Sequence, residues 1–260
     1  MARTPEGPPP PPALQRLRVH YTKRGRLRFS SHRDFQRAFE RALRRAAVPM
    51  AYSAGFSPHP KVSYAGAAPT GTASEAEYLE IALAQRCDPE RLRQALDDSL
   101  PAGLDVLEVV EIAVQGGGAL ADRLQASVWE MRLPGVPYVD ARRAVDGFLA
   151  AGAVEVSRMM KNGLRTFDAR SAVVALDVSD TPDHDPAQGP GSTPCAILRL
   201  VVRHVAPAVR PDDVLAGLRQ IGDLAPPSTP VVTRLAQGPL DETSGAVSDP
   251  LAPDRGGVGT

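Results

Sequence analysis

Residues 24–35 read Arg-Gly-Arg-Leu-Arg-Phe-Ser-Ser-His-Arg-Asp-Phe and form a polar corner between a predicted strand and a predicted helix. Before the corner, Leu17–Tyr21 alternates apolar and polar side chains, which is typical of a half-buried strand. After it, Phe35 begins an apolar face that recurs every three or four residues, as on an amphipathic helix. Ser30 or Ser31 is the expected N-cap of this helix. The corner therefore predicts a strand that leads directly into an amphipathic helix.

The remaining elements predict an internal repeat. Residues 14–115 give the order strand, helix, strand, strand, helix, strand, and residues 124–235 give the same order. In the second half, residues 154–159 and 164–170 are expected to pair as a hairpin, because Asn-Gly lies between them, and residues 196–204 are expected to form a strand. We therefore expect an α+β protein of two tandem ferredoxin-like βαββαβ units, each an antiparallel sheet backed by two helices.

Composition places limits on the class of protein. The 260 residues contain only Cys87 and Cys195, so the sequence predicts neither a disulfide framework nor a zinc motif. The chain lacks a run of 18 apolar residues and an apolar signal sequence, so we expect no membrane contact and a cytoplasmic location. Residues 1–13 and 236–260 are rich in Pro, Gly and small polar residues, and both are expected to be disordered tails.

Charge is distributed unevenly along the chain. The net charge is zero, yet residues 13–61 carry twelve Lys or Arg and only two acids, a local net charge of +10. Such a segment indicates a surface that faces a polyanion. An arginine-rich face that is merely solvated, or one that docks an acidic protein, would have the same composition.

Aromatic side chains lie between the basic residues of this segment, a combination that suits RNA because Arg binds phosphates and aromatic rings stack on unpaired bases. A second basic patch follows at residues 161–170. We predict a nucleic-acid-binding cleft lined by Arg24, Arg26, Arg28, Ser31, His32, Arg37, Tyr52, Phe56, His59, Lys61, Arg165 and Arg170.

Two histidines in this set are candidates for catalysis. His32 stands at the predicted helix start and His59 stands between two prolines. Either imidazole could transfer protons near neutral pH, so a metal-independent endoribonuclease is an alternative function. The sequence has no Gly-x-Ser-x-Gly elbow and no set of metal ligands at suitable spacing, so we predict no metal site.

Four blocks of sequence carry a family resemblance: residues 27–35, residues 52–63 with their Gly-Phe-Ser-Pro-His-Pro-Lys run, Glu75–Glu80, and residues 161–170. Together they resemble the radical-SAM-linked domain family of unknown function over residues 15–235. The resemblance implies a separately encoded radical SAM protein as partner and a functional link to a ribonuclease of the E/G type.

A radical SAM cluster is normally held by three closely spaced cysteines, which this chain does not have. The iron–sulfur cluster, S-adenosylmethionine and any cobalamin are therefore expected on the partner, with no cofactor in this chain. The interpretation we favour is a non-catalytic accessory protein that binds RNA, either tRNA or rRNA, and presents it to that enzyme. The alternatives are the endoribonuclease and a protein-interaction module without RNA contact.

Overall fold

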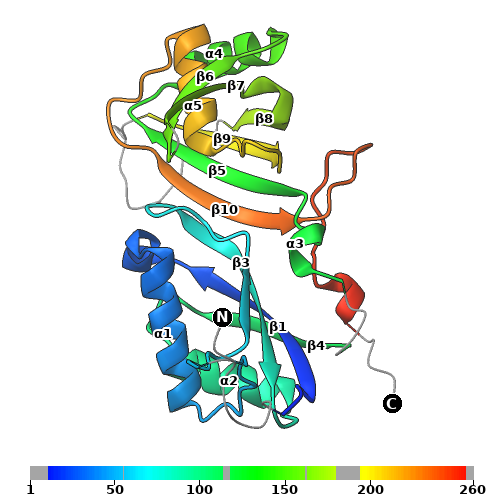
Figure 1. Cartoon of the computed structure of the whole chain (residues 1–260). Coiled ribbons are helices and arrows are strands. Elements are labelled where there is room, and N and C mark those ends of the chain that lie inside the picture. The colour runs from blue at the N-terminus through cyan, green and yellow to red at the C-terminus, as the bar shows by residue number, and fades with distance from the viewer. Residues whose placement is uncertain (1–10, 55, 114–117, 162, 180–193, 256–260) are drawn as a thin grey trace. The chain divides into compact units, whose positions relative to one another are not determined.

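The structure is a computed structural model and describes residues 11–54, 56–113, 118–161, 163–179 and 194–255. In these ranges the chain is α+β, with mostly antiparallel strands and five α-helices, which confirms the predicted class. It divides into two compact units (Figure 1). Unit 1 combines Met1–Leu124 with Asp249–Thr260, and unit 2 is Gln125–Ser248. Most of the predicted N-terminal tail lies outside the described residues.

Unit 1 begins with the predicted strand, corner and helix. Its elements are β1 (Gln15–Lys23), η1 (Gly25–Phe29), α1 (His32–Arg45), β2 (Val62–Ala65), β3 (Ala73–Leu83), α2 (Pro89–Ser99), β4 (Val106–Ile112), α3 (Leu120–Arg123) and η3 (Ala252–Asp254). Antiparallel pairing gives the strand order β4-β1-β3-β2. β1 and β2 both run from the Leu83 end of β3 towards its Ser74 end, and α1 returns between them.

The two faces of this sheet are covered differently. Alternate residues of β1, such as Leu17 and Val19, pack in one cluster with Phe39 of α1 and Leu96 of α2, so both helices cover the same face. A smaller apolar cluster, which includes Leu251 from the C-terminal segment, covers part of the other face.

Among its described residues, unit 2 contains one strand more than the sequence predicts. Its elements are β5 (Ala126–Pro134), α4 (Tyr138–Ala150), β6 (Glu155–Met160), β7 (Gly163–Asp168), η2 (Arg170–Ala172), β8 (Val173–Ser179), β9 (Cys195–Arg203), α5 (Pro211–Gly222) and β10 (Val231–Gly238). The sheet has the order β10-β5-β9-β8, whereas β6 and β7 form a separate hairpin. The predicted pairing of residues 154–159 with residues 164–170 is confirmed by this hairpin, and the strand predicted at residues 196–204 is β9. The sequence did not predict β8, which pairs with β9 in the sheet.

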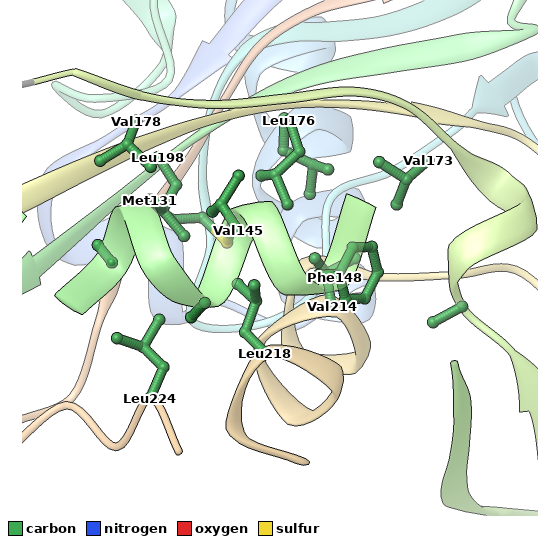
Figure 2. Packing of buried hydrophobic residues seen from close by; sticks show 14 of the residues in the cluster. Met131, Val145, Phe148, Val173, Leu176, Val178, Leu198, Val214, Leu218 and Leu224 are labelled. Carbon is green, nitrogen blue, oxygen red and sulfur yellow. The ribbon is translucent and has the colours of Figure 1, made fainter. Parts of the chain in front are cut away.

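The core of unit 2 lies between this sheet and its two helices. Figure 2 shows Val145 and Phe148 of α4 between sheet residues such as Leu198 and the α5 side chains Val214 and Leu218. All five side chains are fully buried, so α4 is the central layer of this core.

The C-terminal segment is folded over most of the range predicted to be a disordered tail. β10 continues to Gly238, and residues up to Arg255 form turns and a 3-10 helix. Leu251 is completely buried, and the Asp254 carboxylate accepts hydrogen bonds from Arg18 and Arg123, both at 2.7 Å. The prediction is wrong for residues 236–255, because contacts with the far N-terminal strand order a segment of polar composition.

Candidate functional site

Helix α1 starts where the sequence indicates, at a capping box. The Ser31 hydroxyl accepts from the Asp34 backbone N–H at 3.2 Å, and the Asp34 carboxylate accepts from the Ser31 backbone N–H at 3.3 Å. The hydrogen bond from the Ser31 hydroxyl holds the pKa of Asp34 below its ordinary value. Ser31 therefore acts on the helix terminus, and its hydroxyl is already engaged within the chain.

The opposite side of α1 carries a dense set of arginines. Phe35, Phe39 and Leu43 are buried in the core, which turns the charged side chains of the helix to solvent. We call this set, together with two arginines of η1, the arginine ridge: Arg26, Arg28, Arg33, Arg37, Arg41, Arg44 and Arg45. Arg28 is half-buried and the other six are exposed.

The ridge differs from the other arginines of unit 1 in its ion pairs. No member of the ridge forms a salt bridge within the part of the chain that the structure describes. Elsewhere in unit 1, salt bridges to Asp or Glu are made by Arg16, Arg18, Arg24, Arg86, Arg93, Arg123 and Arg255. The positive charge of the ridge is therefore open to an external anion.

Arg24, a predicted site residue, belongs to the paired group. Its Nε donates to the Glu75 carboxylate at 2.7 Å, and Asp105 lies 3.4 Å from its guanidinium. The hydrogen bond with Glu75 raises the pKa of Arg24. Arg24 consequently contributes less to a phosphate site than its neighbours, because its charge is largely compensated.

The side chains next to it form a rigid corner. Arg28 lies over the ring of Phe29, with 4.7 Å between the guanidinium carbon and the ring centroid. The Gly71 backbone N–H donates to the Arg28 carbonyl at 2.8 Å, which ties η1 to the loop before β3. Phe29 is 59% exposed, a large value for an aromatic residue in an ordered element. This corner presents an exposed aromatic ring beside the guanidinium of Arg28.

His32 occupies the first position of α1. Its Nε2 lies 3.0 Å from the Gln36 amide nitrogen, and its ring meets the edge of Tyr64 at 5.0 Å. His59 instead lies in the loop that follows Tyr52, where its backbone N–H donates to the Ser53 hydroxyl at 3.1 Å. The two candidate acid–base residues are thus held by separate local contacts.

The loop of residues 53–59 is attached at the other end of the sheet. Its ends are joined by the Ser53 N–H to the His59 carbonyl at 2.9 Å, and Ala51 donates to Ala82 at 2.8 Å. η1 follows β1 directly, and the end of β1 pairs with β3 at Ser74, whereas the loop of residues 53–59 is attached at Ala82. η1 and this loop are therefore anchored about 25 Å apart along β3. They are not the two walls of one small pocket, and α1, about 21 Å long, spans the distance between them.

Exposed aromatic side chains also lie in both of these stretches, η1 and the segment around residues 52–56. Met50 packs in the core with the helices and Tyr52, two residues later, falls on the same side of the extended segment. Tyr52 is 43% exposed and Phe56 is 69% exposed. Phe29 and Tyr52 therefore mark the two ends of α1.

Lys61 lies on the opposite face of the sheet from α1. Tyr64 packs against Phe35 of the helix, whereas Ala65 belongs to the cluster on the other face, and alternation places Lys61 with Ala65. A groove of about 320 Å³ on that face is lined by Arg16, Lys61, Val62, Ser63, Glu80, Ile81 and Ala82. The structure thus separates Lys61 from the arginine ridge.

The last two predicted residues belong to unit 2. Arg165 is exposed on β7. Arg170 donates to the carbonyls of Val173 at 3.0 Å and Leu149 at 3.4 Å, which ties η2 to the end of α4. Arg170 is therefore engaged within its own unit, and Arg165 is the more accessible of the two.

The predicted site omitted Phe29 and four arginines of the ridge, Arg33, Arg41, Arg44 and Arg45. The row on α1 also includes Arg37, which the predicted site did contain. Arg33, Arg37, Arg41 and Arg45 follow one another at intervals of four, so they form a single row along α1. This periodicity is visible in the sequence and could have identified the row. The exposure of Phe29 has no such signal, because Leu27, two residues earlier, packs against the core.

Other classes of site find little support in the described residues. In these ranges no group of three or more His, Cys, Asp or Glu is placed to hold a metal ion, and no helix is long and apolar enough to cross a membrane. Cys87 and Cys195 are free thiols in different units. The cysteines of this chain therefore do not fit an iron–sulfur cluster.

Comparison with known proteins gives a family without an assigned activity. A search of curated proteins finds no significant match. A family model described as an uncharacterized protein conserved in bacteria matches residues 16–211, which are 196 of the 260 residues. The predicted membership of a family of unknown function is confirmed, whereas the link to radical SAM proteins stays a prediction. The chain belongs to this uncharacterized bacterial family, DUF2344.

Proposed function

We propose that this protein binds RNA through the arginine ridge of unit 1 and acts as an accessory to a separately encoded radical SAM enzyme. The observation that carries the RNA part is that the seven arginines of the ridge form no salt bridge in the described ranges, although acids pair with most other arginines of the same unit. Arginine binds phosphate oxygens with two parallel donors, and a row of them suits a repeating phosphate backbone.

The energetics of α1 support an external ligand. Like charges at i and i+4 on a helix each cost about 0.2–0.5 kcal/mol, and the row Arg33–Arg37–Arg41–Arg45 contains three such pairs. Arg33 also lies in the first turn, where the helix dipole disfavours a cation. A polyanion bound along the row would relieve these repulsions between neighbouring arginines.

The accessory role draws on the fold, the cysteines and the family resemblance. The strand orders β4-β1-β3-β2 and β10-β5-β9-β8, with the β6–β7 hairpin inserted in the second, support our proposal of two ferredoxin-like units. Because two cysteines cannot hold a radical SAM cluster, the cluster, S-adenosylmethionine and any cobalamin would belong to the partner. In this proposal the chain supplies tRNA or rRNA to that enzyme, in a setting that also includes a ribonuclease of the E/G type.

The test is the binding of labelled total tRNA across a salt series. The variant Arg37→Gln/Arg41→Gln removes two charges from the middle of the row, and the logarithmic salt slope should fall by about 0.7–0.9 for each phosphate that the variant no longer binds. Arg91→Gln is the matched control, because Arg91 is also an exposed helical arginine of unit 1 but lies on α2.

We expect weaker binding by the double variant, wild-type binding by the control, and no loss of stability in either. Equal affinity and equal salt slope in the double variant and the wild type would reject the ridge as an RNA site. Binding of an acidic protein with no affinity for tRNA would favour the protein-interaction alternative.

A further inference from the structure

The ridge ends at an aromatic side chain that phosphate binding alone does not require. Phe29 is the last residue of η1 and immediately precedes the serines that cap α1. Its ring is 59% exposed, although its neighbour Leu27 is packed against the core. The local fold therefore turns a large apolar ring outward beside the highest density of positive charge in the chain.

The backbone around Phe29 is held by hydrogen bonds at both ends of η1. The Ser30 hydroxyl and the Ser30 backbone N–H both donate to the Leu27 carbonyl, at 2.6 and 2.9 Å. At the start of η1, Arg24 N–H donates to the Gly103 carbonyl at 2.7 Å. Gly103 has φ +94°, and a Cβ there would lie 2.9 Å from the Arg24 carbonyl oxygen, so only glycine allows this approach. A ligand that stacks on Phe29 would consequently cost little ordering of the backbone.

One face of the ring already has a cationic neighbour. The Arg28 guanidinium lies 4.7 Å from the ring centroid, and its Nε is buried without a hydrogen-bond partner in the described chain. Burial of Nε limits the orientations of the guanidinium, so its other nitrogens remain the available donors. A base stacked on Phe29 would then have its phosphate close to a positioned arginine.

We infer that the ridge recognises single-stranded RNA, with an unpaired base stacked on Phe29 and the backbone phosphates on the arginine row of α1. This inference rests on the proposed RNA binding and adds the class of RNA. Bases in an A-form duplex are stacked on each other and are out of reach of a protein ring, whereas the bases of loops and single strands are free to stack on aromatic side chains. Tyr52 provides a second exposed ring at the other end of α1.

The experiment compares a fluorescent 12-nucleotide RNA without self-complementarity and the same strand annealed to its complement. The key variant is Phe29→Leu, which keeps apolar volume but removes the flat ring, and Phe29→Tyr keeps the ring. Since stacking on one aromatic side chain contributes about 1–3 kcal/mol, Phe29→Leu should weaken single-strand binding by a factor of about 5 to about 150. Phe29→Tyr should bind within about threefold of wild type, and the salt slope should stay the same in both variants.

Each outcome separates this inference from the function on which it rests. Preference of the wild type for the single strand, lost in Phe29→Leu and retained in Phe29→Tyr, supports stacking on Phe29. Equal binding of single strand and duplex that depends on Arg37 and Arg41 but not on Phe29 overturns the inference and leaves RNA binding intact. Failure of the wild type to bind either RNA at low salt removes both.

Discussion

Replacement of Asp254 by Asn should destabilise unit 1, even though the residue lies six positions from the C-terminus. The Asp254 side chain is only 9% exposed and accepts from the fully buried guanidinium of Arg18 at 2.7 Å. Arg123, about a quarter exposed, binds the same carboxylate with two nitrogens, at 2.7 and 3.1 Å. Asp254→Asn preserves the shape of the side chain and removes its charge.

The expected loss of stability depends on the interactions that Arg18 retains in the variant. Removing one member of a buried ion pair costs about 3–5 kcal/mol when the remaining charge is left uncompensated. Arg18 retains the Glu80 carboxylate at 2.8 Å and the Gly118 carbonyl at 2.8 Å. Partial compensation lowers the expected loss, so we predict that Asp254→Asn reduces the free energy of unfolding by about 2 kcal/mol.

Urea unfolding followed by circular dichroism measures this change. Glu242→Gln is the matched control, because Glu242 also pairs with an arginine, Arg203, but its side chain is 68% exposed. The control should change stability by less than about 0.5 kcal/mol. If Asp254→Asn were no more destabilising than Glu242→Gln, the C-terminal segment would not be held on unit 1 by this carboxylate, and the reasoning from burial would be wrong.

Two further predictions concern pH and packing. Burial lowers the pKa of His20 below 6.5, while its Nε2 contacts the Glu75 carbonyl at 2.8 Å, so folding favours the neutral ring. The stability that depends on His20 should be complete above pH 6.5 and decrease as the pH falls below it, and His20→Gln should reduce the loss between pH 7 and pH 5 in thermal melts. In unit 2, a Cβ on Gly222 would lie 2.5 Å from the Cα of Ala144, whereas a Cβ on Gly152 would meet nothing within 4 Å. Gly222→Ala should therefore cost about 1–3 kcal/mol in urea unfolding, and Gly152→Ala should be close to neutral; equal effects would contradict the close approach of α4 and α5.

The elements of unit 1 were predictable because its signals are local. The alternation of β1 and the apolar face of α1 are both visible in windows of about ten residues, and the capping serine marks the boundary between corner and helix. The β6–β7 hairpin shows where local signals fail. Its two segments have the composition of strands, but whether they pair inside the sheet or apart from it depends on β8 and β9 further along the chain.

The order of the C-terminal segment could not be predicted from the sequence for a related reason. Its composition is that of a disordered tail, since Leu251 is the only completely buried hydrophobic residue among the described residues after Gly238. We attribute its order to the ion pair of Asp254 with Arg18, which joins residues 236 positions apart. A composition argument counts the apolar residues of a segment, and it has no access to a buried cation that lies on a distant strand.

The contrast between local signals and contacts with distant residues also explains how much of the candidate site could be predicted from the sequence. Arg24 and Arg37 look equivalent in a list of basic residues, yet Glu75 binds the first and the second has no salt bridge in the described chain. The carboxylates that neutralise an arginine come from other elements, so the sequence shows the amount of charge but not the part that remains uncompensated. Spacing does carry information, because four arginines at intervals of four must share one side of a helix whatever the rest of the fold. A basic segment is therefore better judged by arginines that repeat with the period of their own element than by its net charge. By that criterion the row on α1, rather than the whole +10 segment, is the surface that a polyanion would bind.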